Sequence, residues 1–271
     1  MISRLGAKTI DGVESFGDFC RFSGRALLSL VTSVRRPRNW SLVLPQMYEA
    51  GSRSLPVVMI TGAFVGMVLA VQTVTQFRAI GMESGLGAVV NKSVLRELGP
   101  VLAGIMIAGR VGGGLTAELG TMNVTEQIDA LRAMGTDPIR VLVVPRFIAA
   151  FLLTPLLTVY ADFMGILGGY GVSRFVYGIA PQEFWRLAES TVGMWDVFYG
   201  IIKSFLFGGV MALVSCYKGF RCEPGAAGVG RACTQSFVAT CMAILGINFL
   251  SGMLMNTIHT HLFGAQSWFR M

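Results

Sequence analysis

Five ionisable side chains lie inside or beside long apolar stretches of this sequence: Arg96, Glu97, Arg110, Asp162 and Lys203. A charge in hydrocarbon costs several kcal/mol unless it is paired or hydrated, so each is a candidate functional residue. Such residues could bind a ligand through charge and hydrogen bonds. The alternative is structural, with Arg96–Glu97 and Arg110–Glu118 neutralising each other near helix ends. We expect the structural role for Arg110 and Asp162.

Motifs for bond-breaking chemistry are missing. The nearest approach to a phosphate-binding GxxxxGK[ST] loop is GLGAVVNKS, residues 85–93, which lacks the second glycine. No HExxH, GxSxG or paired-carboxylate pattern is present. The five cysteines form no CxxC pair, and His259 and His261 have no cysteine or carboxylate nearby, so we expect no metal site. The sequence therefore predicts a non-catalytic chain with no cofactor of its own.

Composition indicates an all-α polytopic membrane protein. The chain is 53% hydrophobic and 14% charged, with a mean hydropathy of +0.62. A net charge of +7 suits contact with anionic phospholipid head groups, and no nucleic-acid-binding pattern accompanies it.

The hydrophobic layout predicts an N-terminal segment, 1–53, and a transmembrane domain, 54–271. Charged residues at three- and four-residue steps after Asp11 predict an amphipathic helix that lies in the membrane interface. About five apolar segments are long enough to cross a bilayer, at 54–77, 93–117, 147–173, 197–217 and 233–258. The second segment is rich in small residues, and we expect Gly113 to belong to a close helix–helix contact.

Charge bias predicts the orientation. The chain up to Arg53 holds eight Lys and Arg residues, against three between Arg78 and Arg96, so the N-terminus should be cytoplasmic. Five spans then place the C-terminus outside, on the opposite side of the membrane.

A polar island, Glu118–Arg146, separates the second and third spans. Asn123 and Glu126 have capping-box spacing, Gly135 suits the end of a helix, and Asp137-Pro138 suits the start of another. These signals predict a short amphipathic helix over 124–134, about 16 Å long and too short to cross a bilayer. Such a helix could be an ordinary connector between two spans or a binding site for a cytoplasmic partner.

Three stretches carry a specific resemblance to a known family: RELGPVLAGIMIAGRVGGGLTAELGTM (96–122), TEQIDALRAMGTDPIRVLVVPR (125–146) and CYKGFRCEPGAAGVGRACTQSFV (216–238). They resemble the MlaE/YrbE-type permeases, the membrane subunits of ABC systems that move phospholipids or other lipids across the Gram-negative envelope. The resemblance implies a multi-pass inner-membrane homodimer that works with a separate ATPase, which binds ATP and Mg, and with an MCE-domain lipid-binding protein.

The resemblance also identifies the short helix as a coupling helix that docks on the ATPase. The coupling residues would be Glu126, Gln127, Asp129, Ala130, Leu131, Arg132, Met134 and Gly135.

A lipid pathway is the second implied site. Arg96 and Glu97 belong to the family-like RELGP motif, and Lys203 lies at a comparable depth from the outer face. The polar end of the first span could instead bond to neighbouring helices or line a lipid portal. The expected pathway residues are Leu69, Gln72, Thr73, Gln76, Phe77, Arg96, Glu97 and Lys203.

Two other classes of function compete with an ABC lipid permease. An ATP-independent secondary transporter or channel would be favoured by inverted repeats or carboxylates at the membrane midplane, and neither is found. A structural membrane scaffold is the weaker alternative.

Overall fold

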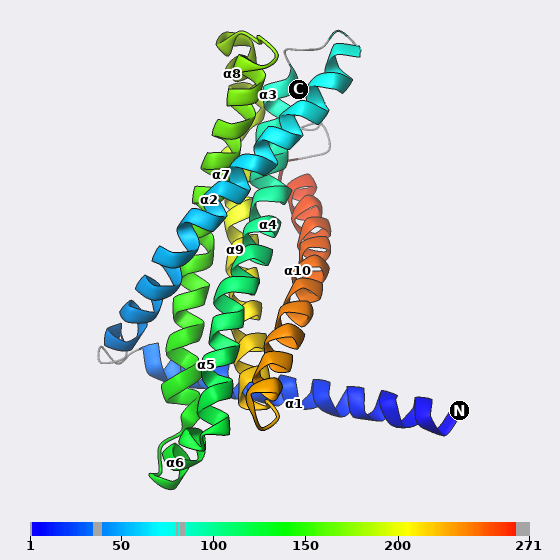
Figure 1. Ribbon diagram of the computed structural model, residues 1–271. Helices are drawn as coiled ribbons and strands as arrows, with labels where there is room; N and C mark the ends of the chain where they lie inside the picture. The colour runs from blue at the N-terminus through cyan, green and yellow to red at the C-terminus, as the bar shows by residue number, and fades with distance from the viewer. Residues whose placement is uncertain (1, 35–39, 80, 82–84, 264–271) are drawn as a thin grey trace.

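The computed structural model describes residues 2–34, 40–79, 81 and 85–263. Every regular element in these ranges is helical. Residues 35–39 of the predicted N-terminal segment, and the side chain of His259, lie outside what is described. The helices are α1 Ile2–Val34, α2 Trp40–Ala79, α3 Leu86–Ser93, α4 Gly99–Ile107, α5 Gly113–Val124, α6 Gln127–Ala133, α7 Val144–Phe175, α8 Pro181–Thr191, α9 Met194–Phe220 and α10 Ala226–Phe263 (Figure 1).

Three π-helical turns join consecutive helices without a break. Val94–Leu98 links α3 to α4, Ala108–Gly112 links α4 to α5, and Ile139–Val143 leads into α7. The second span is therefore one continuous rod with two wide turns. Turns of this kind occur often at functional sites, and the two in this rod carry Arg96, Glu97 and Arg110.

Five helical segments in the described ranges are long and apolar enough to cross a membrane, which confirms the all-α, multi-pass prediction. They are Ser41–Ala79, Leu86–Val124, Ile139–Phe175, Met194–Phe220 and Ala226–Ile258. Their bounds differ from the sequence-based ones. Helix α2 begins at Trp40, so the predicted division at residue 53 falls inside a helix. The exposed Glu49–Arg53 ion pair, 3.1 Å, belongs to a polar extension of the first span.

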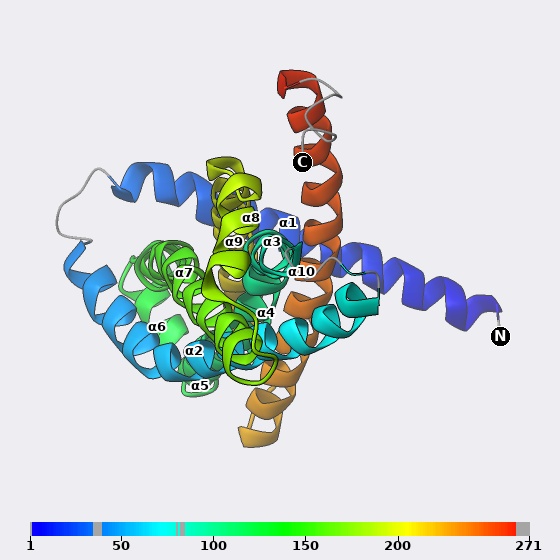
Figure 2. The ribbon, with the colours of Figure 1, turned by 90° about the horizontal axis from the view of Figure 1, so that it is seen from above.

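Helix α1 is the predicted amphipathic helix, and it crosses the lower end of the bundle instead of running along it (Figures 1 and 2). Phe22 and Ala26 pack against the bundle, whereas Ile10, Val13 and Phe16 are exposed. An apolar face without a protein partner, on a helix lying across the bundle, is typical of a helix at a membrane surface.

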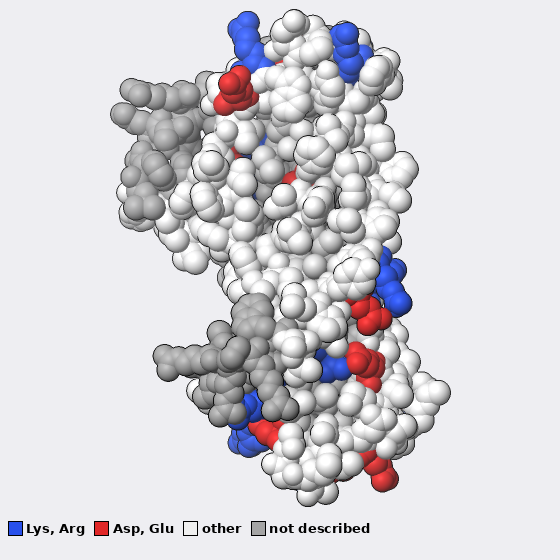
Figure 3. All heavy atoms as spheres, turned by 90° about the vertical axis from the view of Figure 1, so that its left-hand side faces the viewer, with Lys and Arg blue, Asp and Glu red and all other residues white. Residues whose placement is uncertain are grey.

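Helix α7 lies at the centre of the bundle. In its most apolar window 72% of residues are buried, against 28% for the span of α2 and 17% for the span of α10. Figure 2 shows α10 leaning away from the other spans. Seen from the side in Figure 3, charged side chains lie near the top and in the lower half, with a band of uncharged residues between them.

Helices α2 and α7 approach most closely through glycine. A Cβ on Gly66 would overlap the carbonyl oxygen of Gly165, so the two backbones touch. The expectation for Gly113 holds for its backbone only: its carbonyl oxygen lies 3.6 Å from Cys233 Sγ of α10, but a Cβ there would have no heavy atom within 4 Å. Gly112 instead faces Met211 and Ser215. The π-helical turn that ends at Gly112 adds a residue to the helical repeat and so rotates the glycines that follow it.

Candidate functional site

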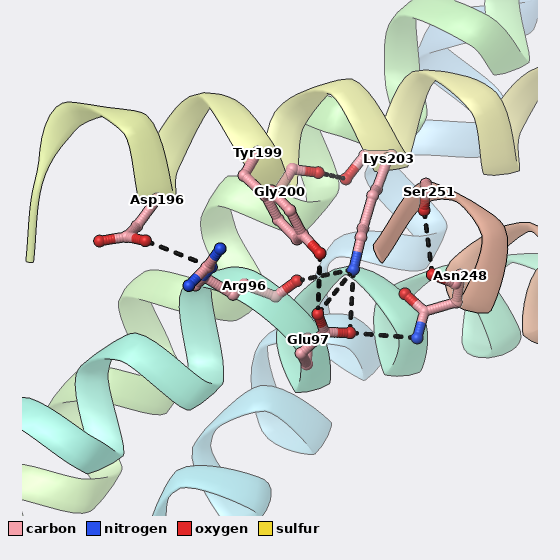
Figure 4. A network of polar contacts seen from close by, with 9 residues as sticks. Arg96, Glu97, Asp196, Tyr199, Gly200, Lys203, Asn248 and Ser251 are labelled. Atoms are coloured by element: carbon pink, nitrogen blue, oxygen red, sulfur yellow. Dashed lines mark hydrogen bonds and ion pairs between the residues drawn. The ribbon is translucent and has the colours of Figure 1, made fainter. Parts of the chain in front are cut away.

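The first candidate site is a polar cluster toward the end of the bundle where α3 and α8 lie. Arg96 and Glu97 come from the π-helical turn between α3 and α4, Tyr199 and Lys203 from α9, and Asn248 from α10 (Figure 4). A Cβ on Gly200 would overlap the carbonyl oxygen of Leu95. This close approach brings α9 near enough for its side chains to reach the turn.

Glu97 is the centre of the cluster. Lys203 Nζ lies 2.8 and 2.9 Å from its two carboxylate oxygens, the Tyr199 hydroxyl donates to Oε1 at 3.1 Å, and Asn248 Nδ2 donates to Oε2 at 3.1 Å. Lys203 also donates to the Arg96 carbonyl oxygen at 3.2 Å. The Lys203 side chain is 0% exposed and that of Glu97 is 45% exposed. The carboxylate is thus held rigidly while part of it stays open to a neighbour.

Arg96 turns to the other side of Tyr199. Its Nε lies 3.3 Å from Asp196 Oδ1, and its guanidinium stands 4.7 Å from the centre of the Tyr199 ring. Lys203 Nζ lies 4.2 Å from the same ring centre. Tyr199 therefore separates two cations and weakens their repulsion through its ring electrons.

The charges of the cluster cancel. Arg96 and Lys203 are each matched by a carboxylate, Asp196 and Glu97 respectively. Charges inside a helix bundle are tolerated when a counter-charge and hydrogen bonds compensate their loss of water. The cluster offers a fixed set of donors and acceptors, and Lys92 adds a further cation near the Arg96–Asp196 pair.

The predicted neutralising pairs are not the ones that form. Arg96 does not pair with Glu97, because the two side chains leave the turn toward different residues of α9. Glu118 pairs with Arg146, 2.5 Å away, whereas Arg110 is exposed in a depression that it shares with Glu118. Ion pairs between residues far apart in the sequence depend on which helices pack together, so the sequence alone does not predict them.

Asp162 has no ion pair among the described residues. It is buried against Gly99, and its Oδ1 has no hydrogen-bond partner in the described chain.

The expected pathway residues fall into two groups. Arg96, Glu97 and Lys203 converge in the cluster, as described. The α2 residues lie apart: Gln72 and Gln76 are exposed, Thr73 is 7% exposed, and Leu69 packs on a core of α2, α3 and α8 residues. Phe77 lies against Gly85. Among the described residues no hydrogen bond or ion pair joins the α2 group to the cluster.

The second candidate site is helix α6, which projects from the opposite end of the bundle (Figure 1). It runs over Gln127–Ala133 and is shorter than predicted. The capping-box prediction is wrong: Asn123 belongs to α5, and Glu126 has a left-handed backbone, φ 58°, with no side-chain cap. A left-handed residue lets the chain reverse between α5 and α6 in so few residues.

The far end of α6 matches its prediction. Gly135 has φ +71°, and the backbone N–H groups of Gly135 and Thr136 donate to the carbonyls of Arg132 and Leu131. This is the Schellman arrangement that a glycine after a helix permits. Asp137 Oδ1 then accepts a hydrogen bond from the Ile139 N–H, 3.0 Å, and caps the next helix.

The two faces of α6 differ. Ile128 is 1% exposed in a cluster with Leu119, Leu142 and Cys216, and Leu131 packs beside it, partly buried. The other expected coupling residues are exposed: Glu126, Gln127, Asp129, Ala130, Arg132, Met134 and Gly135. The structure therefore anchors the helix on one side and presents the other to solvent.

Sequence reasoning missed Asp196, Tyr199 and Asn248 as members of the cluster. Asp196, Tyr199 and Lys203 recur at three- and four-residue steps, which places them on one face of a helix. Asn248 is an amide well inside the fifth span. Both signals were readable in the sequence.

Five spans with a short, anchored helix exposed between the second and third are the features of a transporter permease, and comparisons with known proteins give the same class. A family model described as permease MlaE matches residues 43–254. The chain is 42% identical over 246 residues to a probable ABC transporter permease protein of Rickettsia felis, covering 91% of this chain and 94% of the relative.

Two further relatives extend the comparison. A probable ABC transporter permease protein of Synechocystis is 40% identical, with 86% of this chain and 88% of the relative covered. The intermembrane phospholipid transport system permease protein MlaE of Haemophilus influenzae is 34% identical, with 92% and 95% covered. The chain belongs to the MlaE permease family of ABC transporters and is a multi-pass membrane protein.

Proposed function

We propose that this chain is the membrane subunit of an ABC transporter that moves phospholipid or a related lipid between the inner and outer membranes, driven by a separate ATPase. The observation that carries the proposal is α6, an anchored and exposed helix between two spans, in a chain whose H. influenzae relative is named an intermembrane phospholipid transport permease. The permease itself is not catalytic, and ATP and Mg belong to the partner.

Helix α6 is suited to transmit force. Its exposed face would bind the ATPase, while Ile128 ties it to residues of α5, α9 and the π-helical turn before α7. A movement of the partner would therefore reach three spans through one buried contact. A helix joined to the bundle only by flexible loops would transmit little of it.

The lipid path is proposed at the other end. Glu97 is partly open, and the outward faces of α2 and α10 carry exposed apolar residues, including Phe64, Val68, Phe249 and Leu250. A lipid needs an apolar wall for its chains and hydrogen-bonding groups for its head. A homodimer in which two copies face each other would supply both, with the α2 residues from Leu69 to Phe77 as wall and the cluster as polar patch.

The proposed assembly follows from these assignments. The chain sits in the bacterial inner membrane with its N-terminus and α6 in the cytoplasm and its C-terminus in the periplasm. An MCE-domain lipid-binding protein would receive or deliver lipid on the periplasmic side.

Co-purification tests the proposal. An ATPase should accompany the wild-type chain and be lost from Asp129→Lys, because Asp129 lies on the exposed face of α6. Leu131→Asp is a poorer probe than the sequence alone indicates, since Leu131 is partly buried. Wild-type ATPase binding and transport in Asp129→Lys would show that α6 does not couple the two subunits.

Photo-crosslinking tests the path. A crosslinker at Leu69 or Phe77 should capture labelled lipid, and one at Ile148, near the α6 end of α7, should not. Equal labelling at all three positions would indicate bulk bilayer contact and remove the basis for this path.

A further inference from the structure

A cavity of about 360 Å³ lies beside α6, between α1 and the end of α9. Four arginines line it: Arg21 and Arg25 from α1, Arg132 from α6, and Arg221 after α9. We call it the arginine cavity. It lies at the opposite end of the bundle from the Glu97 cluster and shares no residue with it.

Its floor is rigid. Phe22 packs edge-on against Tyr217 and beside Phe220, with ring centres 5.7 and 5.6 Å apart. The Tyr217 hydroxyl donates to the Ser15 carbonyl at 3.1 Å, which ties α1 to α9. The cavity is therefore preorganised, and a ligand would not have to build it.

The cavity holds an excess of positive charge. Asp18 pairs with Arg221 at 2.8 Å, Asp129 pairs with Arg132 at 2.7 Å from outside the lining, and Asp137 caps a helix. Arg21 and Arg25 have no ion pair among the described residues. They stand one helical turn apart, so their charges repel each other, and an anion between them would relieve that repulsion.

The position of the cavity, not the polarity of α1, favours a protein occupant. Exposed apolar residues surround much of α1, since Leu28 lies about 20° around the helix from Arg21 and Leu27 about 120°. The rest of the lining comes from α6, from the residues that follow it and from the end of α9, all at the α6 end of the bundle.

Arg132 connects the cavity to the exposed face of α6. A partner that covers this face also covers the mouth of the cavity, because Arg132 belongs to both. Arginine pairs with carboxylates through two parallel hydrogen bonds, which gives such a contact geometric selectivity.

We propose that the arginine cavity is a second docking site for the ATPase, filled by an acidic segment whose carboxylates are spaced to meet Arg21 and Arg25. The inference rests on the proposed function for the identity of the partner. It adds a contact that depends on α1 and not on the surface of α6 alone.

The test uses the full chain in lipid nanodiscs and the purified ATPase that accompanies the wild type. Arg21→Gln together with Arg25→Gln should weaken association about tenfold at low ionic strength and reduce its dependence on salt. Arg21→Lys with Arg25→Lys keeps the charge and should lose less. Arg186→Gln removes an exposed arginine at the other end of the bundle and should change nothing.

A photo-crosslinker in place of Arg25 identifies the occupant. Capture of an Asp- and Glu-rich peptide of the ATPase supports the inference, whereas capture of phospholipid alone, or of a peptide without carboxylates, overturns it. If Asp129→Lys loses the ATPase while the double Gln variant binds it normally, the inference fails and the proposed function stands. If the wild type binds no ATPase, both fail.

Discussion

The Glu97 cluster and the surface around α6 use the same residue types in opposite ways. In the cluster, Lys203 is fully buried and its carboxylate partner receives further hydrogen bonds from Tyr199 and Asn248. At the other end, Arg132 and Asp129 form a pair whose side chains are 61% and 64% exposed, and Arg21 and Arg25 have no ion pair among the described residues.

The buried charges of the cluster stabilise the fold, whereas the exposed charges near α6 are available to bind a partner. Removing one member of a buried pair leaves the other uncompensated, which is costly. An exposed pair contributes about 0–1 kcal/mol, so its removal leaves the fold intact. Substitutions in the cluster should therefore lower the free energy of unfolding, and substitutions near α6 should weaken binding of the partner.

Within the cluster, the largest effect on stability is expected from Glu97→Gln. It leaves Lys203 buried without its counter-charge and should lower the free energy of unfolding by roughly 3 kcal/mol. Denaturant titration of the purified chain in detergent measures this. The double variant Glu97→Leu with Lys203→Met removes both charges and should cost less than Glu97→Gln alone. A loss below about 1 kcal/mol for Glu97→Gln would mean that water already solvates Lys203.

A smaller loss is expected from Gly200→Val, which pushes α9 away from the Leu95 carbonyl and so stretches the Lys203–Glu97 contact. We expect about 1–3 kcal/mol, typical of an overpacked helix contact. Gly113→Val is the matched control, since a side chain there meets open space. Equal thermal stability of the two variants would contradict the close approach of α9.

The smallest effect on stability is expected from Asp129→Lys. The free energy of unfolding should change by no more than about 0.5 kcal/mol, because the residue is exposed and its ion pair is weak. Ile128→Ala, one residue away on the buried face, should cost about 2–4 kcal/mol. Similar losses for the two variants would show that α6 has no distinct inner and outer faces.

Much of the fold could be predicted from the sequence because hydrocarbon thickness sets a minimum length for an apolar helix. The five spans, the amphipathic α1 and the glycine end of α6 follow from local patterns. Span ends do not, since α2 begins at Trp40 and continues as helix through the exposed charged residues Glu49 and Arg53.

The sites were predictable only in part. Arg96, Glu97 and Lys203 could be singled out because charges in apolar segments are rare. Asp196, Tyr199 and Asn248 carried readable signals, but the pairing itself could not be predicted. It depends on which helix faces meet, and the π-helical turn at Val94–Leu98 turns Arg96 and Glu97 toward different residues of α9. The left-handed Glu126 was missed because the local pattern matches an ordinary cap.

The most direct measurement of the central claim is ATP-dependent transfer of labelled phospholipid from proteoliposomes that contain this chain and its ATPase. The wild type should transfer lipid only with ATP. Asp129→Lys should lose transfer and ATPase binding while its unfolding free energy stays close to the wild-type value. Undiminished transfer by that variant, or equal transfer by the wild type without ATP, would contradict an ATP-driven permease coupled through α6.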